Sequence, residues 1–506
     1  MFDPALHLFI DDFHIRTVFG LKRTFGSLEK MSQPVLEDIP DRRSAWACVL
    51  REPDGLFRMW YQTVFKESVH DIATAGVWGR GDEYGYFPDR HDNPVLETQT
   101  SGVSYAESND GLQWHKPELG LYEWRGNKKN NIVLDGSHAA TQFDGALTNM
   151  DTVSVIRDES DPDPLRRYKL ICHWETIHVW DNWVSQLDRS EENIKRFWAA
   201  RAKYLTVSPD GIHWNPKLTR IKECAGGGDY AGVTIDERNN RYWFSDRAPV
   251  GLPEVRYRSA GLCSSPDLYK WPETVEMVFS PSAHEDYGQR YEHHGMVPFN
   301  YGDQDLCFLE YSLGGSVIAG ILGTHRDNER WQRANGDTPV LNISPKGSFD
   351  DTSVAVTRNA PFRIEDRLLF FYRGTHAGKN LDSCLHTSHI GAASLRLDGF
   401  AAMEVDSQFV RQAELPAMLI STAVKVRENK LQINISDHGQ SARVGLLSED
   451  MQPIPGFELE ACLALPEDAV RATVHWREQQ STETLIDKKV HLLIQMDAGK
   501  LYAFHL

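Results

Sequence analysis

The stretch Ser108-Asn109-Asp110-Gly111-Leu112-Gln113-Trp114 is the key to the fold, because three further stretches of the chain share its pattern. They lie at residues 208–214, 265–271 and 325–331. In each copy an Asp stands four positions before a Trp. An Asp side chain caps the backbone N–H groups of a tight turn, and Gly tolerates positive φ. Four such turns, each followed by a Trp, indicate repeated β-hairpins.

The spacing of these turns suggests a repeated sheet. The second, third and fourth Trp follow one another at intervals of 57 and 60 residues, and the first interval is 100 residues. Intervals near 60 residues suit one propeller blade of four strands. The longer first interval predicts a blade with insertions, at residues 158–164 and 181–195.

Each repeat contains two strands with alternating or aromatic-rich sequence, which is typical of β-structure. The first strands are predicted at residues 45–51, 152–157, 231–236, 295–299 and 352–358. The second strands are predicted at residues 56–62, 168–174, 241–246, 306–311 and 367–373. Five such units predict a five-bladed β-propeller, in which radial repetition protects the sheet edges. Residues 191–202 are the one stretch predicted to be helical.

The repeated blade pattern of the sequence ends near residue 399. Further strands are predicted at residues 423–426, 431–435, 442–447, 472–476, 490–495 and 501–506, a set that suits one β-sandwich. Residues 8–15 are expected to add an outer strand that closes the propeller ring. The predicted fold is therefore all-β, with a five-bladed β-propeller over residues 1–397 and a C-terminal β-sandwich over residues 398–506.

Composition excludes several classes of protein. The net charge of −18 disfavours nucleic acid as a partner. The seven cysteines include no C-x-x-C pair, which argues against a disulfide framework or a structural zinc site. No basic, apolar leader or membrane-spanning stretch is recognised, so we expect a cytoplasmic protein, or a secreted one if a leader has been removed. The many aromatic residues suit either core packing or sugar stacking. The oligomeric state is left open.

Several stretches resemble bacterial proteins related to glycoside hydrolase family 32. They are residues 105–120 (Tyr-Ala-Glu-Ser-Asn-Asp-Gly-Leu-Gln-Trp-His-Lys-Pro-Glu-Leu-Gly), 130–134 (Asn-Asn-Ile-Val-Leu), 8–12 (Leu-Phe-Ile-Asp-Asp) and 453–457 (Pro-Ile-Pro-Gly-Phe). The resemblance covers nearly the whole chain. It implies a furanosidase-type propeller, acting on fructosides, arabinosides or related sugars, with acidic residues around a funnel on the propeller axis.

The catalytic motifs of that family are incomplete in this chain. The Asn-Asp-Pro and Arg-Asp-Pro motifs are absent, and Glu223-Cys224-Ala225, which is similar to Glu-Cys-Pro, lies before the predicted innermost strand of the third blade. The catalytic acids therefore have to be sought at the starts of the innermost strands.

Glycoside cleavage requires two carboxyl groups across the scissile bond. The starts of the predicted innermost strands carry one acid each. Of these we predict that Asp151, Asp229, Glu292 and Asp351 are catalytic and converge on one pocket, and that Asp41 binds substrate; Asp350 and Asp12 are close competitors. Asp at a strand entry also serves as a turn cap, so this structural reading stays open. In the preferred assignment Asp151 is the nucleophile or base, Glu292 the acid, and Asp229 the stabiliser of the transition state.

Neighbouring residues are candidates to bind sugar hydroxyls or to tune these acids. They are Arg43, Trp46, Asn149, Tyr230, Arg247, His293 and His294. The pair His293-His294 beside Glu292 is also compatible with a metal site, but no third ligand stands at a suitable spacing. No P-loop follows Gly226-Gly227-Gly228, and no G-x-S-x-G elbow occurs. We therefore predict neither a metal site nor a cofactor.

The predicted function is a glycoside hydrolase that acts on a small glycan or oligosaccharide. Two related alternatives stay open. One is a phosphorylase or transglycosylase of the same fold, which requires Arg or His at the funnel base. The other is a carbohydrate-binding propeller without catalysis. A sialidase is disfavoured, because it requires six blades and three arginines around one carboxylate.

Overall fold

The computed structural model describes residues 1–37, 42–65, 101–124, 126–135, 138–139, 142, 148–176, 200–223, 230–248, 259–279, 291–313, 318–326, 330–377 and 386–506. β-Strands dominate these residues. The α-helix α4 (Ser407–Ala413) begins at Asp406, whose carboxylate accepts hydrogen bonds from the backbone N–H groups of Gln408 and Phe409. The helix predicted at residues 191–202 lies almost wholly outside the described residues.

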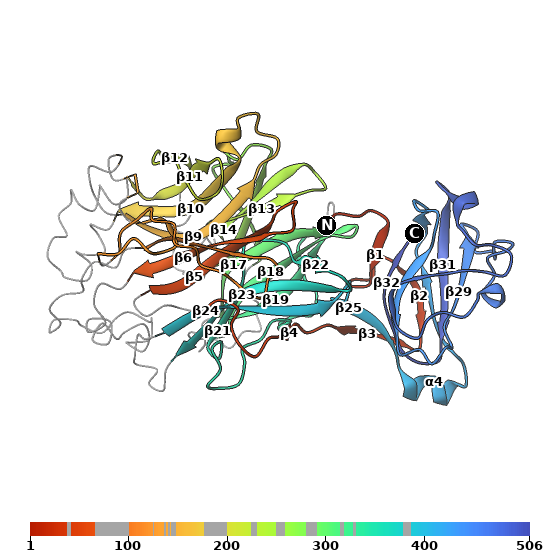
Figure 1. Ribbon diagram of the computed structural model, residues 1–506. Coiled ribbons are helices and arrows are strands. Elements are labelled where there is room, and N and C mark those ends of the chain that lie inside the picture. Colours follow the sequence, from red (N-terminus) through yellow and green to blue (C-terminus); the bar gives the residue numbers. More distant parts are fainter. Residues whose placement is uncertain are drawn as a thin grey trace.

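The chain forms five consecutive antiparallel sheets, here numbered as blades one to five (Figure 1). Blade one is β5 (Arg42–Arg51), β6 (Phe57–Phe65), β7 (Ser101–Ser108) and β8 (Ile132–Leu134). Blade two is β9 (Thr148–Arg157), β10 (Tyr168–Thr176), β11 (Ala202–Ser208) and β12 (Thr219–Lys222). Blade three is β13 (Gly232–Asp236), β14 (Arg241–Ala248), β15 (Ser259–Ser265) and β16 (Glu276–Phe279).

Blade four is β17 (Tyr291–Tyr301), β18 (Gln304–Leu313), β19 (Ile318–His325) and β20 (Gln332–Arg333). Blade five is β21 (Ser353–Val356), β23 (Arg367–Ala377), β24 (His386–Arg396) and β4 (Glu29–Lys30), with β22 (Phe362–Ile364) on the edge of β23. A parallel bridge between Ile318 and Ser353 joins these two blades. All ten predicted strands are confirmed.

The innermost strands close the blades into a ring. Strand β5 contacts β9, β9 contacts β13, and β13 contacts β17; blade five then returns to β5 through β23 and β24. Hydrogen bonds cross between blades at the same level: Arg358 N donates to Ala47 O (2.8 Å), and Ala231 N donates to Thr152 Oγ1 (2.9 Å). The chain is therefore a five-bladed β-propeller followed by a β-sandwich.

Three innermost strands carry a β-bulge where they approach the axis. The pairing register shifts between Ser44 and Ala47 in β5, opposite Cys172 in β9, and between His293 and Gly295 in β17. Thr152, at the second bulge, has a φ of +56°. A bulge turns side chains out of the regular alternation, and such bulges are common beside active sites. Three of the five innermost strands are therefore bent, in blades one, two and four.

The Asp–Trp turns pack one blade against the next. Asp110 Oδ1 accepts from the N–H groups of Leu112 and Gln113, both at 2.8 Å, so the predicted capping role is confirmed for this turn. Asp327, of the fourth turn, lies outside the described residues. The indole of Trp60, in blade one, donates to Gly211 O in the turn of blade two. A Cβ atom at Gly211 would stand 2.6 Å from that indole. This turn therefore needs glycine for close packing as well as for its φ of +76°.

The sandwich contains strands from both ends of the chain (Figure 1). One sheet is β3 (Leu21–Phe25), β25 (Ala401–Val405), β32 (Lys500–His505), β28 (Gln432–Ser436) and β30 (Ala469–Thr473), with β1 (Leu6–Leu8) beside β32. The other is β2 (Ile15–Phe19), β26 (Ala417–Ser421), β31 (Lys489–Met496) and β27 (Val424–Lys425), with β29 (Arg443–Ser448) beside β31. Trp476 is fully buried between them.

The predicted role of residues 8–15 is wrong. The outer strand of blade five is β4, whose Glu29 and Lys30 pair with Ser394 and Ala393. Residues 6–8 pair instead with the last strand of the chain, and Ile15 begins a strand of the sandwich. The apolar side chains of this segment, Leu6 and Leu8, are buried at the junction of propeller and sandwich. Among the described residues no helix is long and apolar enough to cross a membrane.

Candidate functional site

All five blades contribute side chains to one group on the propeller axis. The members are Trp46 from β5, Asp151 from β9, Tyr230 just before β13, Glu310 from β18, and Arg358 and Arg373 from blade five. We call this set the axial cluster. Its members interact across the blades through ring, ion-pair and longer-range charge interactions.

A buried ion pair forms the floor of the axial cluster. Arg358 Nη1 donates to Glu310 Oε1, and these residues are only 2% and 1% exposed. The Arg358 guanidinium lies 4.3 Å from the ring centre of Tyr230 and 4.5 Å from that of Trp46. Cation–π contacts of this kind gain strength where water is excluded. The two rings therefore help the glutamate to hold a cation in the protein interior.

Tyr230 owes its position to two glycines. A Cβ atom at Gly295 would lie 2.0 Å from Tyr230 Cε2, and one at Gly232 would lie 2.8 Å from Tyr230 Cε1. The phenol therefore lies directly on the backbones of β17 and β13. Its hydroxyl donates to Met296 O (3.1 Å), and burial raises the pKa of Tyr230 well above its ordinary value. The side chain is a neutral hydrogen-bond donor at neutral pH.

The accessible part of the axial cluster is formed by Trp46, Asp151 and Arg373, which are partly exposed. The Arg373 guanidinium lies 4.2 Å from the ring centre of Trp46. The Asp151 carboxylate interacts electrostatically with both Arg358 and Arg373. A positive neighbour favours the ionised form of a carboxyl group. Asp151 thus lies within electrostatic reach of two cations.

A second buried pair of oppositely charged residues contacts the backbone of Tyr230. The side chains of Lys203 and Asp246 are both fully buried, with Nζ and Oδ1 3.3 Å apart, and Lys203 Nζ also donates to Tyr230 O. Burial raises the pKa of Asp246 to about 6, although Lys203 opposes the shift. This pair therefore supports the backbone of Tyr230 through Lys203, and neither side chain is accessible.

The predicted residues divide into three groups. Trp46, Asp151 and Tyr230 lie in the axial cluster. Asp41 and Asp229 lie outside the described residues, and for Glu292, Arg43 and Asn149 the structure describes the backbone in β17, β5 and β9 and not the side chain. The predicted convergence of four acids on one pocket therefore stays a prediction.

The structure gives contacts for the remaining predicted residues and their competitor Asp350. Asp351 Oδ1 contacts His376 Nδ1 (3.0 Å), and Asp351 Oδ2 accepts from Gly347 N (2.7 Å). Although burial alone would raise it, these contacts lower the pKa of Asp351. The competing residue Asp350 is buried and bound by Lys30 and Tyr372.

His293, His294 and Arg247 complete the set. His293 is fully buried beside Tyr311, and burial lowers its pKa to about 3. Its Nε2 lies 3.1 Å from Arg333 Nη2. His294 is at the bulge of β17, and Arg247 N donates to Asp246 Oδ1 (2.8 Å).

Half of the axial cluster was not predicted from the sequence: Glu310, Arg358 and Arg373. Each is a charged residue in or beside an apolar or aromatic strand, as in Phe308-Leu309-Glu310-Tyr311 and Phe370-Phe371-Tyr372-Arg373. A charge in a strand that is otherwise buried needs a partner. That rule could have singled them out, although it does not say which charges meet.

One group among the described residues has the composition of a metal site. It consists of His7, His14 and Asp303, and it lies at the junction with the sandwich, away from the axial cluster.

Neither a protein-family model nor a curated protein matches the sequence. Several solved structures resemble the chain at low identity. An N-acetylgalactosamine deacetylase from F. plautii, in complex with blood group B trisaccharide, is 13% identical with a TM-score of 0.43, over 76% of this chain and 97% of that chain. The β-1,2-mannobiose phosphorylase from Listeria innocua is 12% identical with a TM-score of 0.43, over 76% and 99%. A thermostable family-43 glycoside hydrolase is 11% identical with a TM-score of 0.43, over 72% and 93%. None of these three names family 32.

Proposed function

We propose that this protein is a glycoside hydrolase that cleaves a small glycan or oligosaccharide at the axial cluster. The proposed substrate class is fructoside-like or arabinoside-like, as the resemblance to glycoside hydrolase family 32 implies. The proposed catalytic domain is the propeller, which the sequence places within residues 1–397. The sandwich of residues 398–506, to which β1, β2 and β3 also belong, supports it.

The observation that carries this proposal is the placement of Asp151. It is a partly exposed residue of the axial cluster, and its carboxylate interacts electrostatically with the guanidinium groups of Arg358 and Arg373. Nearby positive charge keeps a carboxylate ionised, as a nucleophile or a base requires. The Arg373 guanidinium is a donor suited to sugar hydroxyls.

The proposed mechanism uses paired carboxyl groups. Asp151 attacks the anomeric carbon or activates water, Glu292 protonates the leaving oxygen, and Asp229 stabilises the oxocarbenium-like transition state. A carboxyl separation of about 5–5.5 Å would accompany retention of configuration, and about 6.5–9.5 Å would accompany inversion. The anomer released first, followed by NMR, distinguishes the two.

The test is a screen of the purified chain against aryl glycofuranosides and glycopyranosides. We expect release of the aryl group from at least one substrate, and a loss of at least about 10³-fold in Asp151→Asn, because a nucleophile or base is removed. Glu449→Gln, which changes an exposed carboxylate of the sandwich, is the matched control. Full activity in a folded Asp151→Asn variant would contradict the assignment.

Phosphorolysis is the second candidate, and the partly exposed Arg373 favours it. Its Nε has no hydrogen-bond acceptor among the described residues. Guanidinium groups of this kind suit a phosphate as the attacking group. The same screen is therefore run with and without phosphate. A sugar phosphate as product would replace hydrolysis by phosphorolysis, whereas saturable sugar binding without turnover would indicate a binding protein.

A further inference from the structure

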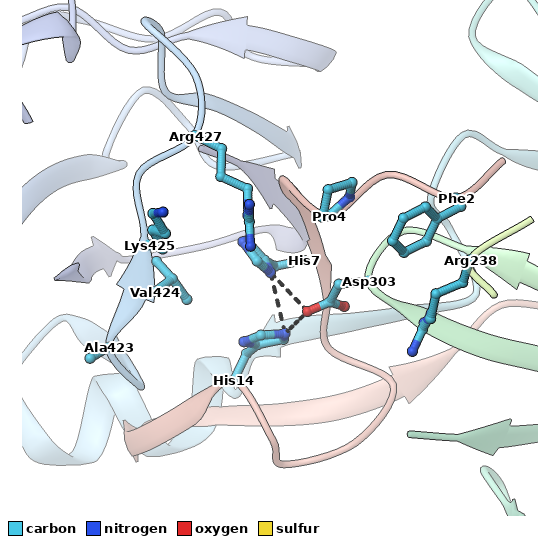
Figure 2. Close-up of a pocket in the computed structure, with 10 residues that line it drawn as sticks. All are labelled: Phe2, Pro4, His7, His14, Arg238, Asp303, Ala423, Val424, Lys425 and Arg427. Atoms are coloured by element: carbon cyan, nitrogen blue, oxygen red, sulfur yellow. Dashed lines mark hydrogen bonds and ion pairs between the residues drawn. The ribbon is translucent and has the colours of Figure 1, made fainter. Parts of the chain in front are cut away.

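A cavity of about 370 Å³ lies where the N-terminal segment passes between the propeller and the sandwich (Figure 2). His7 in β1, His14 just before β2, and Asp303 in the turn between β17 and β18 form one wall. Val424 and Arg427, from the sandwich, also line the cavity. The cavity therefore touches both parts of the molecule.

Three potential ligand atoms converge in this wall. His7 Nδ1 is 3.0 Å from Asp303 Oδ2, His14 Nε2 is 2.5 Å from the same oxygen, and the two ring nitrogens are 3.3 Å apart (Figure 2). Neighbouring ligands around an ion with bonds of about 2.0–2.2 Å stand roughly 3 Å apart. One ion can therefore bind all three atoms from one side, with little movement of the rings.

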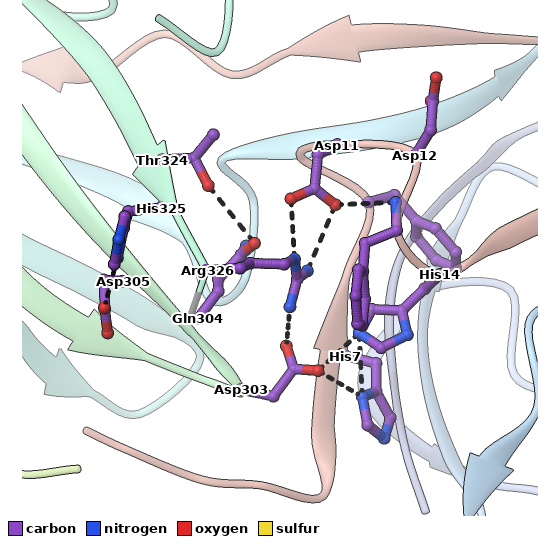
Figure 3. Close-up of polar contacts among 12 residues, drawn as sticks. His7, Asp11, Asp12, His14, Asp303, Gln304, Asp305, Thr324, His325 and Arg326 are labelled. Atoms are coloured by element: carbon purple, nitrogen blue, oxygen red, sulfur yellow. Dashed lines mark hydrogen bonds and ion pairs between the residues drawn. The ribbon is translucent and has the colours of Figure 1, made fainter. Parts of the chain in front are cut away.

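The carboxylate is held in place from behind. Arg326 Nη1 donates to Asp303 Oδ1 (3.1 Å), and Arg326 Nε donates to Asp11 Oδ2 (2.9 Å) (Figure 3). Oδ1 is thus bound by the arginine while Oδ2 faces the histidines. Metal-binding carboxylates usually have such outer partners, which fix their orientation. His7 and His14 are 6% and 3% exposed, so the protein positions them as well.

The donor set decides which ion fits. Imidazole nitrogens and one carboxylate suit Zn²⁺ and related transition metals, whereas Ca²⁺ and Mg²⁺ prefer oxygen ligands. The cavity leaves room for a fourth ligand. Arg427 and Lys425 line it, so we expect this ligand to be water or a small anion.

We propose that His7, His14 and Asp303 bind one divalent transition metal ion of the Zn²⁺ type, which fastens the sandwich to the propeller. The two histidines lie on a segment that pairs with sandwich strands, and Asp303 belongs to blade four. The ion would join the parts through side chains, beside the backbone bond from Asp303 N to Leu6 O. This proposal departs from the sequence-based prediction of no metal site. The sequence did not reveal the group, because 289 positions separate His14 from Asp303.

The test uses the full chain after removal of metal by chelation and dialysis. Titration with Co²⁺, followed by visible d–d absorption, and with Zn²⁺, followed by calorimetry, should give one site per chain. Ca²⁺ should not compete. The midpoint temperature of thermal unfolding should rise by a few degrees when Zn²⁺ is present at saturating concentration.

Variants separate this site from other histidines of the chain. His7→Gln and His14→Gln should each weaken Zn²⁺ binding by at least about 100-fold, more than the loss of an outer-sphere partner. His213→Gln, which changes an exposed histidine paired with Asp210, is the matched control and should bind normally. Asp303→Asn keeps the shape of the side chain and serves where a histidine variant fails to fold.

Two results would overturn the proposal. One is the absence of a stoichiometric site, with the same unfolding temperature with and without Zn²⁺; the three side chains would then be only a hydrogen-bonded clamp. The other is equal Co²⁺ spectra and affinities in wild type, His14→Gln and Asp303→Asn, because the ion would then be bound elsewhere.

Discussion

Arg358, which follows the innermost strand of blade five, forms a buried ion pair with Glu310 on the second strand of blade four. Taking two charges out of water is costly, and the pair recovers that cost only while both members are present. Here the rings of Trp46 and Tyr230 supply further stabilisation for the cation. We therefore expect that removing one charge of the pair destabilises the whole floor of the axial cluster.

Glu310→Ala should lower the free energy of unfolding by about 3–5 kcal/mol, because it leaves the Arg358 cation buried without its carboxylate. The double variant Glu310→Leu with Arg358→Met should recover much of this loss. Denaturant unfolding of the three proteins measures both effects. Glu29→Gln is the control: it breaks the exposed pair with Arg367, which should cost about 0–1 kcal/mol. A single variant as stable as the double one would refute the coupling.

Gly295→Ala should displace Tyr230, since the added methyl group would occupy the position of its ring. We expect a loss of about 1–3 kcal/mol, which is typical of overpacking. Gly320→Ala, on β19 of the same blade, is the matched control, because the nearest atom there is 3.1 Å away on the side chain of Leu341. Thermal unfolding compares the two variants. If both cost the same, the contact of Tyr230 with β17 is not what requires glycine.

Asp246 makes the free energy of unfolding depend on pH. Its pKa is raised to about 6 in the folded protein, from 3.8 in the unfolded chain. Between these values the folded protein holds a proton that the unfolded chain has released. Asp246 therefore stabilises the folded protein fully below about pH 4. As the pH rises to about 6, the free energy of unfolding falls by roughly 3 kcal/mol. Asp246→Asn should remove this part of the profile in denaturant unfolding from pH 4 to 7, whereas Glu449→Gln should keep it.

The blades could be predicted because their signals are local. Alternating strands and the Asp–Trp turns are written within a few residues, and every predicted blade strand is present in the structure. The N-terminal strands were misplaced because their partners are distant: Leu6 pairs with His505, and no nearby pattern records that choice. Strand pairing of this kind depends on the whole fold.

The axial cluster could be predicted only in part, for a similar reason. The starts of the innermost strands pointed to Asp151 and Tyr230, because radial repetition brings such positions to the axis. Glu310 and Arg373 come from second strands, and Glu310 pairs with Gly295 where the innermost strand β17 is bulged. Bulges change which side chains face the centre, and single sequences do not reveal them.

Arg373 is expected to tune Asp151 rather than to react with substrate. Its positive charge interacts with the Asp151 carboxylate, and a nearby cation favours the ionised form of a carboxyl group. If Asp151 is the nucleophile or base, Arg373→Gln should move the acidic limb of the pH profile of kcat/KM to higher pH, because protonation of Asp151 becomes easier.

Arg373→Lys is the matched variant, because it keeps the charge and loses only the planar guanidinium on the indole of Trp46. It should leave the acidic limb near its wild-type position even if kcat falls. An arginine that only supports the fold would lower activity equally at every pH in both variants. An acidic limb that stays in place in Arg373→Gln would therefore remove Asp151 as the group that titrates there.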